Sequence, residues 1–330
     1  MALAVTQFVA GALVSLAMSW ILVTRIERVG ERFGFSEALL GVLAALAADA
    51  PEITASITAL AQGHRSVGVG VVIGSNSFNL AALLGAGAVV SGFVALHRRV
   101  VILGGVVALW IASSCAMVVA GLVPVTVGLA LAASVLAVYV VILGWRRPAG
   151  SPRRPGGAAA WLRAAVHEEE LELAEAIRPT PANRLDAIVA AAATVIVVAA
   201  SVAMEHGATD LGRRWNVSDA VVGGLVLAAA TSLPNAVAGI HLAATGRGAA
   251  ALSTALNSNN LNVVIGLLIP GAVVGVSTPS LAGGLTAWTY LGLTVVVLGA
   301  ALASKGLTRR AGAVILGGYA VFVVSLAIVR

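Results

Sequence analysis

Two acidic residues, Asp49 and Glu52, lie inside one of the most apolar stretches of this chain, on either side of Pro51. Their spacing of three residues puts both carboxyl groups on one face of a helix. A charged side chain at the centre of a membrane-spanning helix costs about 2.5–3.5 kcal/mol, so such residues generally serve a function. The other acidic residues fall in expected loops or at expected helix ends. We therefore expect Asp49 and Glu52 to form the charged part of a cation site.

The polar residues around this pair occur twice in the chain. The first copy reads Ala48-Asp49-Ala50-Pro51-Glu52 and then Gly74-Ser75-Asn76-Ser77-Phe78-Asn79. The second copy reads Thr231-Ser232-Leu233-Pro234-Asn235 and then Asn257-Ser258-Asn259-Asn260-Leu261-Asn262. The proline precedes the serine of the later segment by 24 residues in both copies. A polar site built twice from one design at membrane depth is typical of secondary transporters, which hold ions near the bilayer midplane.

The later segment of each copy supplies neutral oxygen atoms. Ser75 and Asn79 are four residues apart and share a helix face, and Ser258 and Asn262 repeat this pair. Carboxylate, amide, hydroxyl and carbonyl oxygens are the ligands that Ca²⁺ and Na⁺ prefer. The neighbouring Asn76 could bind a cation or could connect two helices by hydrogen bonds, and its position alone does not decide between these roles.

The two prolines add candidate backbone ligands. A proline inside a helix removes the amide that would bond the carbonyl four residues earlier. Pro51 frees the carbonyl of Ala47 in this way, and Pro234 frees that of Ala230. A freed carbonyl in the membrane needs a partner, which can be a cation or the hydroxyl of a nearby serine or threonine. Because the prolines occupy equivalent places in both copies, we expect both carbonyls to face the cation.

The elements that position these residues are membrane-spanning helices. The chain is 59% hydrophobic and 10% charged, with a mean hydropathy of +1.01. Apolar runs long enough to cross a hydrocarbon core of about 30 Å recur ten times. They cover residues 2–24, 37–61, 67–95, 99–120, 123–145, 185–204, 219–244, 249–274, 281–303 and 311–329. The sequence predicts an all-α membrane protein with ten transmembrane helices, the first being retained rather than cleaved as a signal peptide.

The positive charges indicate the orientation. If the N-terminus lies outside and the chain crosses ten times, 16 of the 20 lysines and arginines fall on the inside. This asymmetry follows the positive-inside rule, so the net charge of +6 reports topology and does not indicate a nucleic-acid partner. We expect a multi-pass protein of the cell membrane, with the lipid bilayer and inorganic cations as its partners. Its single cysteine, Cys115, permits no intrachain disulfide.

The spans divide into two halves of five. Residues 1–145 form the first half, the polar segment 146–184 is a cytoplasmic linker, and residues 185–330 form the second half. Because five is odd, the second half enters the membrane from the opposite side, which makes the repeats inverted. Within the linker, residues 157–177 predict one charged helix. Ser36 and Ser218 are candidate N-caps of the second and seventh spans.

These motifs resemble those of the cation/calcium exchanger superfamily, in particular its prokaryotic sodium/calcium exchanger-like members. Thr231-Ser232-Leu233-Pro234 and Gly74-Ser75-Asn76-Ser77-Phe78-Asn79 match the two segments that characterise that family's alpha repeats. The resemblance covers the whole ten-helix layout. It implies a 5+5 inverted-topology repeat, an ion site among spans two, three, seven and eight, and alternating access by movement of spans one and six. The candidate ligands are Asp49, Glu52, Ser75, Asn79, Thr231, Ser232, Asn235, Ser258, Asn262, and the carbonyls of Ala47 and Ala230.

The chain departs from the family pattern at three places. The family's second proline-linked glutamate is Asn235 here, and the acid often found at the end of the second Ser-Asn motif is Asn262. In the first copy, Ala48-Asp49 replaces the usual Thr-Ser, so that a carboxylate appears at the position equivalent to Ser232. Two acids therefore remain, both in the second span.

The resemblance implies a secondary active cation antiporter that exchanges Ca²⁺ for Na⁺. Two alternatives stay open: a cation/proton exchanger, because a proton can also neutralise a carboxylate, and a non-transporting cation-binding protein of the same fold. An enzyme is not expected, since the sequence contains no nucleophile–base pair, no histidine–cysteine metal cluster and no phosphate-binding loop. For the same reasons no cofactor is expected, and Ca²⁺ with Na⁺ or H⁺ would be the transported ions.

Overall fold

The computed structural model describes residues 1–144, 157–176 and 183–329. The first half and the linker contain α1 (Ala2–Arg32), α2 (Glu37–Ala48), α3 (Ala50–Ala61), α4 (Arg65–Asn79), η1 (Leu80–Ala86), α5 (Gly87–Ser91), β1 (Phe93–Ala95), α6 (Arg98–Val119), α7 (Val125–Gly144) and α8 (Gly157–Ala176). The second half contains α9 (Arg184–Arg214), α10 (Asp219–Val221), η2 (Val222–Leu227), α11 (Ala228–Ala244), α12 (Gly248–Leu261), η3 (Asn262–Leu268), α13 (Ile269–Val274), α14 (Leu281–Ser304), β2 (Gly306–Thr308) and α15 (Arg309–Ile328).

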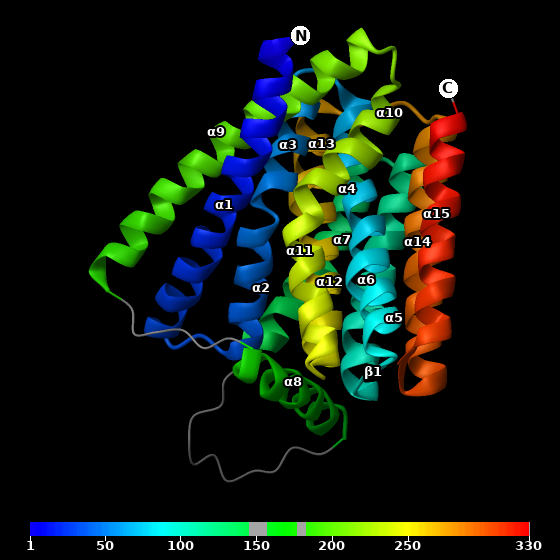
Figure 1. Cartoon of the computed structure of the whole chain (residues 1–330). Coiled ribbons are helices and arrows are strands. Elements are labelled where there is room, and N and C mark those ends of the chain that lie inside the picture. Colours follow the sequence, from blue (N-terminus) through cyan, green and yellow to red (C-terminus); the bar gives the residue numbers. More distant parts are fainter. Residues whose placement is uncertain (145–156, 177–182, 330) are drawn as a thin grey trace.

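These elements form ten membrane spans in two sets of five. Nine helical segments of the described chain are long and apolar enough to cross a bilayer, and the bent pair α2–α3 makes a tenth span. Both chain ends lie at one end of the bundle and α8 lies at the other, as an even number of crossings requires (Figure 1). The second set starts from the end opposite to the first, so the prediction of an all-α membrane protein with a 5+5 inverted repeat is confirmed.

The second span is broken beside the acidic pair. Helix α2 ends at Ala48 and α3 begins at Ala50, and the two axes differ by 50°. Pro51 therefore lies in the first turn of a new helix, where its missing amide needs no partner, and does not kink a continuous one. The expected i, i+3 pair of acids still sits on one short segment, but Asp49 occupies the joint between the helices and Glu52 the first turn of α3.

The equivalent span in the second half is continuous at its proline. Pro234 lies inside α11, and the irregular part of this span comes earlier, in the π-helical segment η2. Ser36 caps α2, since its Oγ accepts a hydrogen bond from the Leu39 amide at 3.2 Å. Ser218 is also at a helix N-cap, but its side chain makes no capping bond. The two halves share a topology without sharing these local details.

Glycines let the two halves approach each other closely behind the site. Helix α4 crosses η2 so tightly that a Cβ built on Gly74 would lie 2.3 Å from the carbonyl oxygen of Gly224. A Cβ on Gly223 would likewise lie 2.3 Å from the carbonyl oxygen of Val67. Membrane helices generally associate through such small residues, because their backbones can then touch. This crossing brings the first polar segment of one half against the second half.

Helix α9 extends ten residues beyond the expected span 185–204. It continues to Arg214 and packs along α1, beside which it runs on one flank of the bundle (Figure 1). Glu205, which the sequence placed at a helix end, is consequently in mid-helix and has no exposed surface. The expectation that Asp49 and Glu52 are the only deep acids was therefore wrong. The charged residues after 204 end the apolar run but do not end the helix.

A short two-stranded sheet and the linker helix α8 lie at the same end of the bundle (Figure 1). Strands β1 and β2 pair antiparallel, with Val94 opposite Leu307, and join the loop after α5 to the loop after α14. The predicted linker helix is α8, which packs on α2, α6, α7 and α12. Arg99 of α6 forms an ion pair with Glu168 of α8 at 2.5 Å.

Candidate cation site

The two acids of the first copy are buried where the four helices of the polar segments meet. Asp49 and Glu52 have no exposed surface, and neither takes part in an ion pair with another described residue. Each contacts the second half of the molecule through a neutral donor. Two uncompensated carboxylates at membrane depth are costly unless a cation joins them, since a buried charge needs a partner.

The contacts between the second and seventh spans form a symmetric pair. Ser232 Oγ donates to Glu52 Oε1 at 2.9 Å, and Asn235 Nδ2 donates to Asp49 Oδ1 at 2.8 Å. Because Asp49 is equivalent to Ser232, and Glu52 to Asn235, the repeat axis exchanges these two hydrogen bonds. Both acceptors, however, come from the first half and both donors from α11. Where the family pattern has a second glutamate, this chain has the neutral Asn235. The second carboxylate comes instead from Asp49, the residue to which Asn235 donates.

Ser258 connects this pair to the third span. Its Oγ donates to Asp49 Oδ1 at 2.7 Å and accepts from Asn79 Nδ2 at 3.1 Å. Ser75 is the equivalent residue in the first half, and it donates to the Val71 carbonyl of its own helix at 2.6 Å. The residue equivalent to Asp49 on its side is Ser232, which offers no carboxylate. Thr231 likewise donates to Leu227 O at 3.0 Å. Hydroxyl groups that donate to their own helix keep oxygen lone pairs free for another ligand.

Asparagines join α4 to α12. Asn76 Nδ2 donates to the Asn259 carbonyl at 3.0 Å, and Asn259 Nδ2 donates to the Asn76 carbonyl at 3.1 Å. These two bonds are also exchanged by the repeat axis, so these residues connect helices. Asn79 and Asn262 complete the pattern, donating to Asn259 Oδ1 at 3.2 Å and to Asn76 Oδ1 at 3.3 Å.

Four buried side-chain oxygens of this cluster accept no hydrogen bond from any described residue: Asp49 Oδ2, Glu52 Oε2, Asn79 Oδ1 and Asn262 Oδ1. Buried polar atoms are normally satisfied, so a group of unsatisfied acceptors calls for a ligand that provides positive charge. Two carboxylate and two amide oxygens form the hard donor set typical of calcium and sodium sites. The chemistry of these residues therefore fits a bare or partly hydrated cation.

The two backbone candidates differ from each other. The carbonyl of Ala47 accepts a hydrogen bond from Ser19 Oγ of α1 at 2.9 Å, and the same hydroxyl lies 3.2 Å from Ala48 O. The carbonyl freed by the break is thus already partnered by a serine. For Ala230, four residues before Pro234, the structure gives no side-chain partner among the described residues. Their role as cation ligands stays a prediction.

Sequence reasoning missed Ser19 and the π-helical segments. Ser19 shares a helix face with Ser15, four residues earlier in the same apolar span, and this spacing is the signal that could have singled it out. The segments η1 and η3 follow directly after Asn79 and Leu261, at equivalent places in the two halves. Such π-helical turns often mark functional sites, but no residue type encodes them reliably.

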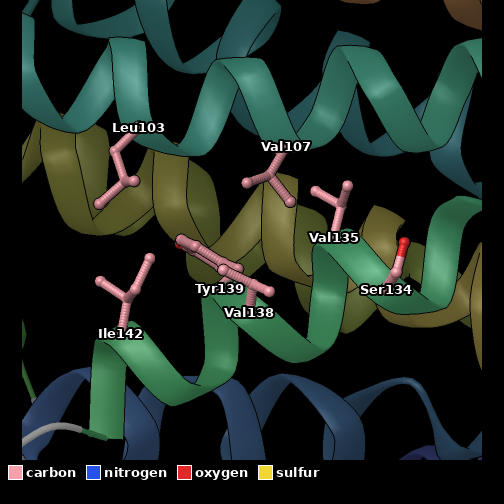
Figure 2. A pocket seen from close by; sticks show the side chains of 7 residues that line it. All are labelled: Leu103, Val107, Ser134, Val135, Val138, Tyr139 and Ile142. Atoms are coloured by element: carbon pink, nitrogen blue, oxygen red, sulfur yellow. The ribbon is translucent and has the colours of Figure 1, made fainter.

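A hollow between α6 and α7 differs in character from the candidate cation site. It has a volume of about 250 Å³ and is lined by Leu103, Val107, Ser134, Val135, Val138, Tyr139 and Ile142 (Figure 2). None of these residues carries a charge, and Val138 is largely exposed on the outer face of the bundle. This hollow suits hydrocarbon chains and offers no site for a cation.

Comparisons with known proteins agree with this arrangement. The family model described as sodium/calcium exchanger protein matches residues 3–146 and 186–327. Among solved structures, the H⁺/Ca²⁺ exchanger CAX is similar with a TM-score of 0.68 and 14% identity, over 98% of this chain and 86% of that chain. The structure of native YfkE gives 0.67 and 15%, over 98% and 93% of the chains.

The sodium-calcium exchanger NCX_Mj, soaked with Na⁺ and Sr²⁺, gives a TM-score of 0.64 and 20% identity, over 98% of both chains. At these identities the solved structures show a shared fold. No curated protein matches the chain at a significant level.

Proposed function

Because the chain belongs to the sodium/calcium exchanger protein family, whose members are cation antiporters, we propose that it exchanges Ca²⁺ for Na⁺ by alternating access. The observation that carries this proposal is the buried cluster of four unsatisfied oxygens, two from carboxylates and two from amides. Two carboxylates match the charge of one Ca²⁺ and can equally be neutralised by two Na⁺. The competing ions would then occupy one pocket in turn, which is what obligatory exchange requires.

We assign the cation to the space bounded by Asp49, Glu52, Asn79 and Asn262. The hydroxyls of Ser75, Ser258, Thr231 and Ser232 would tune its affinity. Asn235 donates to Asp49 through its amide nitrogen, and it would turn its amide oxygen to the ion if it served as a ligand. The carbonyls of Ala47 and Ala230 would complete the shell as hydration is removed.

A second candidate is exchange of a cation for protons. The fold is shared with the H⁺/Ca²⁺ exchanger CAX as well as with NCX_Mj. In addition, both carboxylates accept hydrogen bonds from neutral donors and have no fixed cationic partner among the described residues, so a proton could neutralise either. A third candidate, cation binding without flux, would follow if the replacement at Asn235 had disabled exchange.

We place the protein in the cell membrane, with its N-terminus outside and the 146–184 linker in the cytoplasm. The two halves, residues 1–145 and 185–330, would be the two units that share the site. This orientation rests on the arginine asymmetry described above.

The test is calcium flux into vesicles reconstituted with the purified chain, with sodium and proton gradients imposed separately. A sodium gradient alone should drive calcium uptake, and Glu52→Gln should abolish it. Asp210→Asn is the matched control, because Asp210 is an exposed acid paired with Arg214 on the surface. Uptake driven by a proton gradient alone would favour the second candidate. Binding of ⁴⁵Ca²⁺ without any flux would favour the third.

A further inference from the structure

A further buried acid, Glu205, lies away from the cation site and, unlike the buried Asp186, has no arginine in an ion pair with it among the described residues. Glu205 is nine residues before the end of α9 and has no exposed surface. Helix α9 ends at Arg214, at the end of the bundle that carries both chain termini, which the proposed orientation places outside (Figure 1). The mechanism proposed above does not use this residue. A carboxylate kept out of solvent at the outer end of a helix needs its own explanation.

The surroundings of Glu205 are rich in groups that can bind protons. Thr209 Oγ1 donates to Glu205 Oε1 at 2.9 Å, and His64 Nδ1 lies 3.5 Å from the same oxygen. His206 Nε2 lies 3.8 Å from Oε2. Glu205 Oε2 and His64 Nδ1 are both buried and have no hydrogen-bond partner among the described residues. Since His64 immediately precedes α4, the cluster spans from α9 to the α3–α4 turn.

The hydrogen-bond partners fix the protons on the two imidazoles. Arg213 contacts His64 Nε2 and can only donate, so Nε2 is an acceptor and the His64 proton lies on Nδ1, facing Glu205. The Gln62 amide nitrogen contacts His206 Nε2, which is therefore also an acceptor. In this arrangement each imidazole carries its proton on Nδ1, and its Nε2 accepts a hydrogen bond from Arg213 or Gln62 that a further proton would displace.

The other charged groups near Glu205 are accounted for. Among the described residues, α1 brings no ionisable side chain before Arg25, α3 brings none after Glu52, and η2 brings none. On α9, Asp210 pairs with Arg214. Arg65, at the start of α4, donates to the Val274 carbonyl at 2.7 Å. Glu205 is thus left with the two histidines as its nearest titratable partners, and Arg213 as the nearest fixed positive charge beyond His64.

We propose that Glu205, His64 and His206 form a proton-binding site at the outer end of α9, which fastens this helix to the α3–α4 turn when the outside becomes acidic. A proton on His64 Nε2 displaces Arg213 into solvent and converts the Nδ1–H···Glu205 contact into an ion pair. A proton on His206 Nε2 adds a second positive charge beside Oε2. Histidine ordinarily changes charge between about pH 5 and 8, which suits a response to external acidity.

The consequence for transport rests on the proposed function. Alternating access would require α1 and α9 to move against the helices that hold the site. An ionic fastening between α9 and the α3–α4 turn would slow that movement and lower the maximal rate. Proton competition at Asp49 and Glu52, in contrast, would raise the calcium concentration needed for half-maximal rate and could be overcome by more calcium.

The first arm of the test measures calcium flux at saturating calcium as external pH falls from about 7.5 to about 5.5, the range in which histidine titrates. The wild-type maximal rate should fall several-fold, whereas His64→Gln and Glu205→Gln should keep most of theirs. His167→Gln is the matched control, because His167 is exposed on α8 at the opposite end. It should behave as wild type. An equal acid response in wild type and His64→Gln would overturn the proposal.

The second arm does not depend on transport. Thermal unfolding of the detergent-solubilised protein is followed for wild type, His64→Gln, Glu205→Gln and the double variant. If protonated His64 pairs with Glu205 in the folded protein, the two substitutions should be strongly non-additive near pH 5.5 and nearly additive near pH 8. Additivity at both pH values would overturn the proton site. Absence of flux at every pH with non-additivity retained would instead refute the proposed function alone.

Discussion

At the scale of single residues, the site carries its two charges on one side of the repeat axis. Asp49 and Glu52 both come from the first half, and the donors Ser232 and Asn235 both come from α11. The sequence alone singled out all four residues as candidates, because acids and a duplicated proline motif stand out in apolar spans. From the sequence, Asn235 was expected opposite Glu52. In the structure it pairs with Asp49 instead, because the pairing depends on how the second and seventh spans cross.

Removing either acid should stop transport without harming the fold. Asp49→Asn or Glu52→Gln leaves one carboxylate for a divalent ion, and the Coulomb attraction of the pocket falls with each lost charge. Neither acid is in an ion pair among the described residues, so neutralisation should leave thermal stability unchanged or raise it. Calcium flux and melting temperature of both variants, beside Asp210→Asn, check this. Wild-type flux in either variant would remove that residue from the site.

Moving the second charge back across the axis should restore a site of the usual family pattern. Asn235→Glu alone puts a third carboxylate beside Asp49, and their mutual repulsion should weaken calcium binding at low pH and make it steeply pH-dependent. Adding Asp49→Ser removes one of these three carboxylates and leaves a serine at 49 facing a glutamate at 235. This pair has the chemistry of Ser232 with Glu52, but its carboxylate comes from α11. The double variant should therefore bind calcium more tightly than Asn235→Glu. Isothermal titration of wild type, both singles and the double measures this, and equal affinities for Asn235→Glu and the double would contradict it.

At the scale of elements, hydrophobic run lengths predicted the spans well but not their interruptions. The break at Asp49 was expected only as a proline kink, because the sequence does not say whether a proline bends one helix or begins another. Likewise the charged residues after 204 hid the last ten residues of α9, since tertiary contact with α1 and α3 keeps them helical. The glycine pairs of α4 and η2 could be seen in the sequence, but their mutual contact could not.

The close crossing of α4 and η2 should tolerate no side chain. Gly74→Ala would push a methyl group to 2.3 Å from the Gly224 carbonyl oxygen, where backbone on both sides prevents relaxation. We expect a loss of about 1–3 kcal/mol, as for other overpacked interfaces, and a clear drop in melting temperature. Gly317→Ala in α15 is the control, since a Cβ there meets nothing within 4 Å. Equal melting temperatures for the two variants would show that the crossing can open.

At the scale of the whole molecule, ten crossings place both termini at one end and α8 at the other (Figure 1). The arginine asymmetry then predicts which end faces the cytoplasm. The position of both termini at one end was predictable from sequence because it follows from the number of spans, whereas the side that faces the cytoplasm stays a prediction.

Labelling of single cysteines checks the orientation. Cys115 is fully buried, so the wild type should show little background with a membrane-impermeant maleimide. Leu122→Cys lies in the exposed loop between α6 and α7, at the proposed outer end, and should be labelled on intact cells. Phe33→Cys lies in the exposed turn after α1, at the inner end, and should react only after the cells are opened. The reverse pattern would invert the topology.

The one-sided placement of the acids also bears on the energy of the two access states. In an inverted repeat whose halves are chemically identical, the inward-open and outward-open forms are related by the two-fold axis in the membrane plane and have equal energy. In this chain the two-fold axis relates the carboxylates of Asp49 and Glu52 to the hydroxyl of Ser232 and the amide of Asn235. The two access states should therefore differ in energy, and we expect the empty carrier to favour one of them. If the chain exchanges ions by alternating access as proposed, its half-saturation constants for calcium should differ between the two faces of the membrane.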